Sequence, residues 1–198
     1  MKKLLLTTMC LFAICFSYAQ TNETSTEQHL KFKGIPIDGT PSEFGAKLKA
    51  NGFVYDETFA GNPWYKGSFA GYHYCSICVK VHNNLVYEIV ALLPNNYSWN
   101  HLYDAYSSIK DMLTTKYGEP WLNEEKFENT PSYVNIEDDN EKFREVKKGN
   151  CKYVAAYTSL KDGLGTIVME IKDSGRIGLY YEDYANSQKK KSSAINDL

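Results

Sequence analysis

Residues 72–93 read YHYCSICVKVHNNLVYEIVALL, a pattern that predicts two paired β-strands. Apolar side chains alternate with polar or aromatic ones over its first half, at Cys75, Ile77, Val79 and Val81. Because side chains two apart in a strand share a face, we expect Tyr72, Tyr74 and Cys78 on the opposite face. Asn83-Asn84 can adopt the left-handed backbone angles of a tight hairpin turn. Residues 85–93 are therefore expected to return as the antiparallel partner strand.

The C-terminal part of the chain carries the same kind of pattern. Residues 152–160, 165–171 and 177–183 are predicted to form three strands of a meander, with turns at 161–163 and 173–175. Short turns between successive strands imply antiparallel pairing, which favours an α+β fold over an α/β fold.

Two helices are predicted. Thr40-Pro41-Ser42-Glu43 has the residues of a capping box with proline at the first helical position, and Gly52 supplies the stop. Residues 98–117 carry one apolar stripe at three- and four-residue spacing. We therefore predict an α+β fold: an antiparallel sheet of about seven or more strands with two helices on one face. Because each helix precedes a group of strands, two α-plus-meander repeats are one arrangement that fits.

The expected core gathers apolar side chains from these elements, because one face of each strand or helix must be buried. Its members are Phe32, Ile35, Phe44, Leu48, Ile77, Val79, Val81, Val86, Val90, Leu102, Tyr106, Ile109, Leu113, Val154, Ile167, Met169 and Leu179.

The N-terminus has the pattern of a secretory signal peptide. A short basic head precedes an apolar run, and Ser17-Tyr18-Ala19 offers small side chains for cleavage after residue 19. Residues 20–29 are expected to be a disordered leader, 30–184 a single domain, and 185–198 a flexible polar tail. The protein is thus expected to be exported, to a periplasm or to the exterior.

The composition of the chain limits the classes of partner that it can be expected to bind. Without residues 1–19 the chain keeps 20 basic and 24 acidic side chains, a net charge of −4, which argues against a nucleic-acid partner. The processed chain has no apolar stretch of the roughly 20 residues that a membrane span needs.

Two motifs resemble a known family. Phe32-Lys33-Gly34-Ile35-Pro36-Ile37-Asp38-Gly39-Thr40 is followed by a helix and Lys49-Ala50-Asn51-Gly52-Phe53, and Leu113–Pro120 ends the second helix. Together they resemble exported proteins of Bacteroides-type gut bacteria, a family with no established activity. The resemblance implies an envelope or extracellular location. More loosely, a helix followed by a meander, twice, resembles small periplasmic binding or inhibitor modules, which is a likeness of fold alone.

The expected strand over residues 72–82 limits which disulfides the cysteines can form. Cys75 and Cys78 have redox-motif spacing, but residues three apart in a strand face opposite sides at about 10 Å. A bridge between them is not expected, whereas a disulfide from Cys151 to Cys75 or to Cys78 stays open.

Other constellations favour structural roles. His101, Asp104 and Ser108 share one helical face, which is expected to be solvated because a catalytic triad gathers residues from separate elements. The acidic run 137–139 lacks the glycine and the final glutamate of a calcium loop. No metal site and no cofactor is expected.

The aromatic side chains are the best candidates for a binding site, since tyrosine and tryptophan combine an apolar body with a hydrogen-bonding tip. The candidate residues are Trp64, Tyr65, Tyr72, Tyr74 and Trp121. We therefore expect a non-catalytic binding or interaction module, whose partner is a glycan or a protein of the envelope or exterior. It would use the aromatic sheet face or the connection 121–149, although these tyrosines could equally be ordinary strand residues.

Two other classes remain open. One alternative is a hydrolase with a site built from His73, His101 or a carboxylate. The other is a redox or metal protein that uses Cys75 and Cys78.

Overall fold

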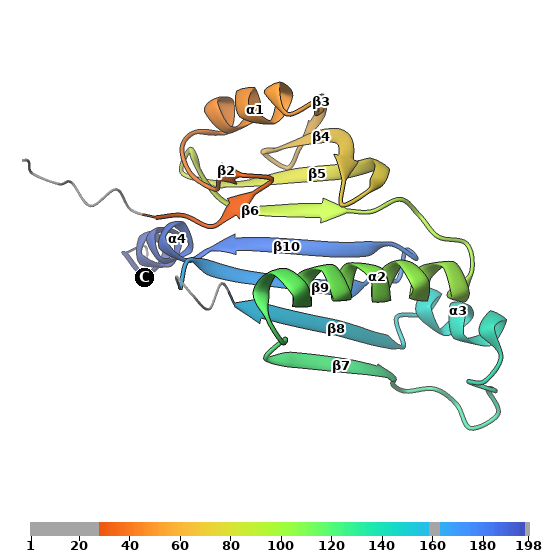
Figure 1. Ribbon diagram of the computed structural model, residues 1–198. Coiled ribbons are helices and arrows are strands. Elements are labelled where there is room, and N and C mark those ends of the chain that lie inside the picture. Colours follow the sequence, from red (N-terminus) through yellow and green to blue (C-terminus); the bar gives the residue numbers. More distant parts are fainter. Residues whose placement is uncertain (1–27, 159–162, 197–198) are drawn as a thin grey trace, which may run out of the picture.

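The computed structural model describes residues 28–158 and 163–196 (Figure 1). Its strands are β1 (Lys31–Phe32), β2 (Ile35–Pro36), β3 (Val54–Phe59), β4 (Asn62–Phe69), β5 (Tyr72–His82), β6 (Leu85–Leu92), β7 (Leu122–Phe127), β8 (Cys151–Thr158), β9 (Gly165–Ile171) and β10 (Ile177–Asp183). Its helices are α1 (Pro41–Ala50), α2 (Trp99–Tyr117), α3 (Asp139–Lys147) and α4 (Tyr184–Asn196). Eight strands form one antiparallel sheet, so the predicted α+β class is confirmed.

The sheet has two similar halves. Its strand order is β3-β4-β5-β6-β10-β9-β8-β7, and β1 and β2 pair separately. Helix α1 precedes β3–β6 and helix α2 precedes β7–β10, so each half is a helix followed by a four-stranded meander. The last strand of each half, β6 or β10, pairs with the other at the centre of the sheet. The expected pair of α-plus-meander units is therefore present, with α3 inserted between β7 and β8.

Local sequence signals place the first two helices. The Thr40 hydroxyl accepts a hydrogen bond from the Glu43 backbone N–H, and the Glu43 carboxylate accepts one from the Thr40 backbone N–H. This reciprocal capping box starts α1 where it was predicted. Helix α2 follows the N-cap Ser98 and ends at Gly118, whose φ of 86° suits glycine.

The hairpin at 72–93 also forms as predicted. Strand β5 is extended, and Asn83 and Asn84 turn the chain with φ values of 46° and 62°. Gly175 lies in the expected turn between β9 and β10, whereas Lys161 and Asp162 of the other predicted turn lie outside the described residues.

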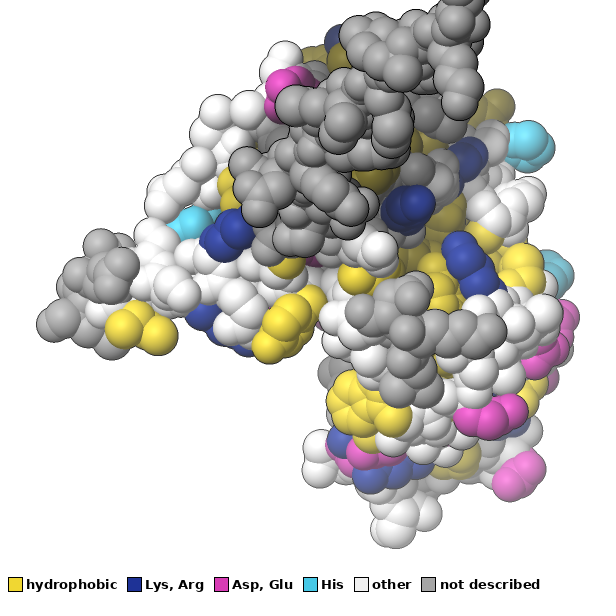
Figure 2. All heavy atoms as spheres, turned by 60° about the vertical axis from the view of Figure 1, so that its left-hand side comes forward, with side chains coloured by type: hydrophobic (Ala, Val, Ile, Leu, Met, Phe, Trp, Pro, Cys, Tyr) yellow, Lys and Arg dark blue, Asp and Glu magenta, His cyan; other side chains and the backbone are white. Residues whose placement is uncertain are grey.

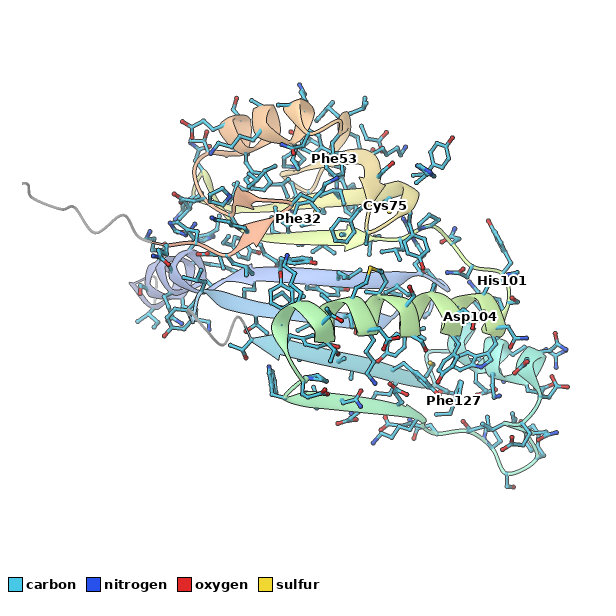
Figure 3. The ribbon with its side chains drawn as sticks, viewed as in Figure 1. Phe32, Phe53, Cys75, His101, Asp104 and Phe127 are labelled. Atoms are coloured by element: carbon cyan, nitrogen blue, oxygen red, sulfur yellow. The ribbon has the colours of Figure 1, made fainter. Side chains whose placement is uncertain are left out.

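Helices α1 and α2 cover one face of the sheet, and the core lies between them and the strands (Figure 1). Figure 3 shows Phe32, Phe53 and Cys75 on this covered side. Most of the predicted core is confirmed. The prediction was wrong for Val90 and Val154. Their registers place them on the opposite face of the sheet, across from Tyr180 and Glu170 respectively.

The C-terminal segment is helical, so the prediction of a flexible tail from residue 185 is wrong. Helix α4 continues directly from β10 and lies at one end of the sheet (Figure 1). The Asn186 side-chain amide lies 3.0 Å from the carbonyl oxygens of Ile37 and Val86. These hydrogen bonds, rather than an apolar stripe, hold the first turn of α4 against the sheet.

The N-terminal boundary also shifts. The expected signal peptide and residues 20–27 of the expected leader lie outside the described residues. His29, however, is buried, and its ring lies 3.1 Å from the Asp183 carboxylate, which also accepts the Leu30 N–H. The end of the predicted disordered leader is therefore part of the folded domain.

The connection 121–149 contains β7 and α3. Asp138, from the acidic run, is the N-cap of α3 and accepts hydrogen bonds from the backbone N–H groups of Asn140 and Glu141. Acidic groups there are favourable because a helix N-terminus carries a partial positive charge. In the described part of the chain, no helix is long and apolar enough to cross a membrane.

Candidate functional site

The sheet face opposite α1 and α2 is the candidate site, and we call it the open face. On strands β5 and β6, the paired residues Ile77 and Ala91 point to the helix side. The next pair, Cys78 and Val90, points to the open face. The core cluster under the helices includes Ile77 and Ala91 but neither Cys78 nor Val90. The open face is therefore a second surface of the sheet, separate from the core.

One row of side chains crosses the open face from β4 to β7 without a polar interruption of the apolar surface. Its members are directly paired from strand to strand: Trp64, Cys78, Val90, Tyr180, Val168, Ala156 and Leu122. We call this set the apolar row. Cys78, Val90 and Ala156 are buried among their neighbours, whereas the other four members are half-buried. The row thus presents Trp64, Tyr180, Val168 and Leu122 to solvent.

Charged side chains border the apolar row, and most of them are paired. Lys66 lies 2.9 Å from Asp56, Lys152 lies 2.6 Å from Glu124, and Lys172 lies 2.7 Å from Glu170. Exposed pairs of this kind add little stability. They do leave the edges of the row electrically balanced.

Glu88 and Glu182 break this balance at the centre. They lie directly opposite each other on β6 and β10, and Lys80 lies directly opposite Glu88 on β5, where its charge offsets part of this repulsion. Burial, followed by the charge of Glu182, raises the pKa of Glu88 above its usual range. Both carboxylates line a depression of about 280 Å³ next to Tyr180 and Val168. This depression could accept a cationic group beside an apolar one.

The five aromatic residues proposed from the sequence do not form one patch. Trp64 lies on the open face, as the apolar row requires. Tyr65 belongs to the core, where its hydroxyl lies against Gly45 of α1, so its assignment to a binding site is wrong. Tyr74 and Trp121 are 85% and 63% exposed and come from different halves of the sheet.

Tyr72 is on the unexpected side. Its hydroxyl lies near Ser108 of α2, and its ring packs against the core cluster. The cause is a register shift between Gly67 and Phe69 of β4, together with a φ of 57° at Tyr74. A bulge of this kind re-aims the side chains beyond it. The predicted surface of Tyr72, Tyr74 and Cys78 therefore does not exist.

The cysteines are separated. Cys75 and Cys78 point to opposite faces of β5, as predicted, and all three described cysteines are free thiols. Strands β5 and β8 are separated by β6, β10 and β9, so Cys151 lies roughly 19 Å from β5 at about 4.8 Å per strand. A disulfide needs α-carbons within about 7 Å, so the structure excludes the bridge from Cys151 that the sequence left open. Burial raises the pKa of Cys78 to about 11 and that of Cys151 to about 12.

Histidine chemistry is dispersed. His101 and Asp104 lie on the exposed surface of α2, as expected (Figure 3). His73 Nδ1 lies 2.9 Å from the Ser68 hydroxyl, and this pair is exposed. The described residues contain no group of three histidine, cysteine or acidic side chains that could hold a metal ion.

Two features of the structure were not predicted from the sequence, one of them in the site. Tyr180, Val168 and Leu122 could have been found from period-two alternation, because they occupy the positions between predicted core residues. The buried contact between His29 and Asp183 had no sequence signal, since 154 residues separate the partners. Comparisons of the chain with protein-family models, with curated proteins and with solved structures found no match.

Proposed function

We propose that this protein is a non-catalytic binding module that recognises a partner protein through the open face of its sheet. The apolar row is the observation that carries this proposal. A folded protein stabilises itself by burying apolar surface on one side of a sheet, whereas here apolar side chains also line the other side.

The dimensions of the apolar row suit a protein partner. Seven strands at about 4.8 Å spacing make the row roughly 29 Å long. A standard protein interface buries about 800 Å² on each partner, which corresponds to a patch of about this width. Five of its seven members are aliphatic or cysteine, and only Trp64 and Tyr180 are aromatic. We therefore favour a protein over a glycan, because sugar rings are held by aromatic faces together with many polar groups.

The charges next to the row specify the chemistry of the partner. Glu88 and Glu182 lie beside Tyr180 and Val168, and the described residues offset their charges only in part, through Lys80 and Lys190. A lysine or arginine side chain of the partner would offset their mutual repulsion, and desolvated charge pairs of this kind favour one orientation of binding. We propose a partner that presents an apolar ridge with a basic side chain beside it.

The location remains part of the proposal. The basic head, apolar run and small residues of positions 1–19 support export, and the resemblance to exported Bacteroides-type proteins points the same way. The partner would then be an envelope or extracellular protein.

Site-specific photo-cross-linking tests the proposal. A benzophenone amino acid replaces Lys66 or Lys152 on the open face, and His101 or Asp104 on the outer surface of α2 serves as the matched control. We expect a discrete cross-linked protein from the open-face positions only, and we expect Val168→Glu to remove it. Equal cross-linking from both faces, or full cross-linking in the Val168→Glu variant, would overturn the proposal. Binding of a glycan, and of no protein, at the open face would show that the partner is a sugar.

A hydrolase is the second candidate, and one observation favours it. The Ser68 hydroxyl lies within hydrogen-bond distance of His73 Nδ1, which is the contact between a nucleophile and its base. Both residues are exposed, and no carboxylate contacts His73 among the described residues. A fluorophosphonate probe would label an activated Ser68 and would fail to label Ser68→Ala. We expect no labelling of either form.

A further inference from the structure

A second cavity lies on the helix side of the molecule, at the end of the sheet where the described chain begins. It has a volume of about 900 Å³. Its walls come from the segment 28–39, from the first turns of α1 and from the last turn of α2. The cavity therefore opens between the two halves of the fold. Figure 2 looks onto this end of the molecule, where dark-blue basic side chains lie beside hydrophobic ones.

The two carboxylates in the wall are already satisfied by the protein. Glu43 accepts hydrogen bonds from the Thr40 backbone N–H and hydroxyl, and these bonds lower the pKa of Glu43. Asp38 lies 3.0 Å from the Asn186 amide and 3.5 Å from His29 Nε2. Burial by itself would raise the pKa of Asp38, but hydrogen bonds from Asn186 and the Gly39 backbone lower it overall. Both groups are ionised and held by internal donors.

The lysines in the wall are held less tightly by the described residues, although the charge of Lys47 helps to lower the pKa of Glu43. Lys31 of β1, Lys47 of α1 and Lys116 of α2 all line the cavity. Across the described residues none of the three makes an ion pair, and Lys116 contacts only the face of the Tyr117 ring. The three lysines outnumber the two carboxylates, whose oxygens already accept internal hydrogen bonds, so the wall has a net positive charge and its free donors are the lysines.

Apolar groups complete the wall. Leu30, Pro36, Tyr117 and Leu164 line the same cavity. Binding cavities for small molecules combine such a mainly apolar lining with a few polar groups that fix orientation. From this combination we infer that the cavity binds an amphiphilic anion: a molecule with one acidic head, carboxylate or phosphate, on an apolar body. The head lies among Lys31, Lys47 and Lys116, and the body lies against the apolar wall.

Competition among molecules that share one tail tests this inference. The reporter is the fluorescent sulfonate 8-anilinonaphthalene-1-sulfonate, bound to the chain beginning at Gln20. The competitors are decanoate, decyl phosphate, decanol and decyltrimethylammonium, which differ only in the head group. We expect both anions to displace the reporter, decanol to be at least about tenfold weaker, and the cation to fail. Preference for decanoate or for decyl phosphate distinguishes a fatty acid from a phosphate-bearing lipid as the source of the ligand.

Charge-removing variants locate the site. Lys47→Gln and Lys116→Gln should each weaken decanoate about tenfold, because each removes one charged hydrogen-bond donor. Lys49→Gln, on the same helix but outside the cavity wall, is the matched control and should bind as the parent does. Equal affinity for all four head groups, or unchanged affinity in both cavity variants with intact thermal unfolding, would overturn the inference.

The outcome is independent of the partner-protein proposal. Val168→Glu changes the open face and should leave displacement by decanoate unchanged. Loss of displacement in Val168→Glu, with displacement retained in Lys47→Gln and Lys116→Gln, would instead place the anion on the open face and refute the cavity site.

Discussion

Replacing Asp183 by alanine should destabilise the protein strongly, although this residue lies next to a segment that reads as a polar tail. The Asp183 carboxylate is fully buried and lies at the end of β10. It accepts the Leu30 N–H at 2.8 Å and the Asn186 N–H at 2.9 Å, and it lies 3.1 Å from the His29 ring. One side chain therefore joins the N-terminal segment, the central sheet and α4.

The expected loss follows from the donors that alanine would leave without an acceptor. A buried donor left unsatisfied costs about 1–3 kcal/mol, and Asp183→Ala creates two in the backbone, at Leu30 and Asn186. His29 keeps its second contact, with Asp38. We expect the free energy of unfolding to fall by about 3 kcal/mol, which moves the urea midpoint by roughly 1.5 M for a slope of about 2 kcal/mol/M.

Equilibrium urea unfolding followed by circular dichroism measures this change. Asp104→Ala is the control, because Asp104 is exposed on α2 and should change stability by less than about 0.5 kcal/mol. Hydrogen exchange provides the second readout, since the amides of α4 should lose more protection than those of α2. A loss below about 1 kcal/mol with unchanged protection of α4 would refute the reasoning, because the three contacts would then contribute almost nothing.

Three further changes test other parts of the structure. Gly67→Ala would place a methyl carbon 2.3 Å from the Phe53 ring. The free energy of unfolding measured in urea titrations should therefore fall by about 1–3 kcal/mol. Glu88→Gln should stabilise the protein by a few tenths of a kcal/mol at pH 7, because burial and the repulsion from Glu182 outweigh the attraction of Glu88 to Lys80. Because the pKa of Glu88 is raised in the folded state, protonation of Glu88 favours folding at low pH. This stabilisation is lost as the pH rises through the pKa of Glu88, so the free energies of unfolding of Glu88→Gln and the parent should converge below about pH 4. Cys78, with a pKa of about 11, should be only about one-thousandth thiolate at pH 8 and should react slowly with a disulfide reagent until urea unfolds the chain.

Each of these three predictions has a control variant or an outcome that would contradict it. Ser68→Ala, next to Gly67 and exposed, should leave the urea midpoint in place. Equal stability of Glu88→Gln and the parent at both pH values would contradict the repulsion across β6 and β10. Fast thiol reaction in the folded chain would show that Cys78 is accessible and would reopen a redox role.

Side-chain periodicity predicted most of the sheet but could not say which face the helices cover. The alternation in β5 placed Ile77 and Cys78 on opposite sides, and the structure agrees. It did not reveal that Trp64 faces solvent while its neighbour Tyr65 lies under α1. The choice depends on contacts with another element, here the absence of a side chain at Gly45, and no local pattern records that contact.

Two helices escaped prediction for related reasons. Helix α3 has few apolar residues, among them Phe143 and Val146, so its stripe is too short to stand out. Helix α4 has lysines and serines where a stripe would be, and it is held by the amide of Asn186 instead. A hydrogen bond between residues almost 150 positions apart leaves no periodic trace in the sequence.

Local structure could be predicted from the amino-acid sequence: the capping box of α1, the stripe of α2, the Asn83-Asn84 turn and the alternation of the strands. These features depend on residues within a few positions of one another, so their physical causes are local. Only the tertiary structure decided the strand order, the bulge that turns Tyr72 inward, the separation of Cys151 from β5 and the alignment of seven side chains into the apolar row. Those features arise where distant segments compete to bury the same surface, and the outcome depends on packing and registers that no single segment contains.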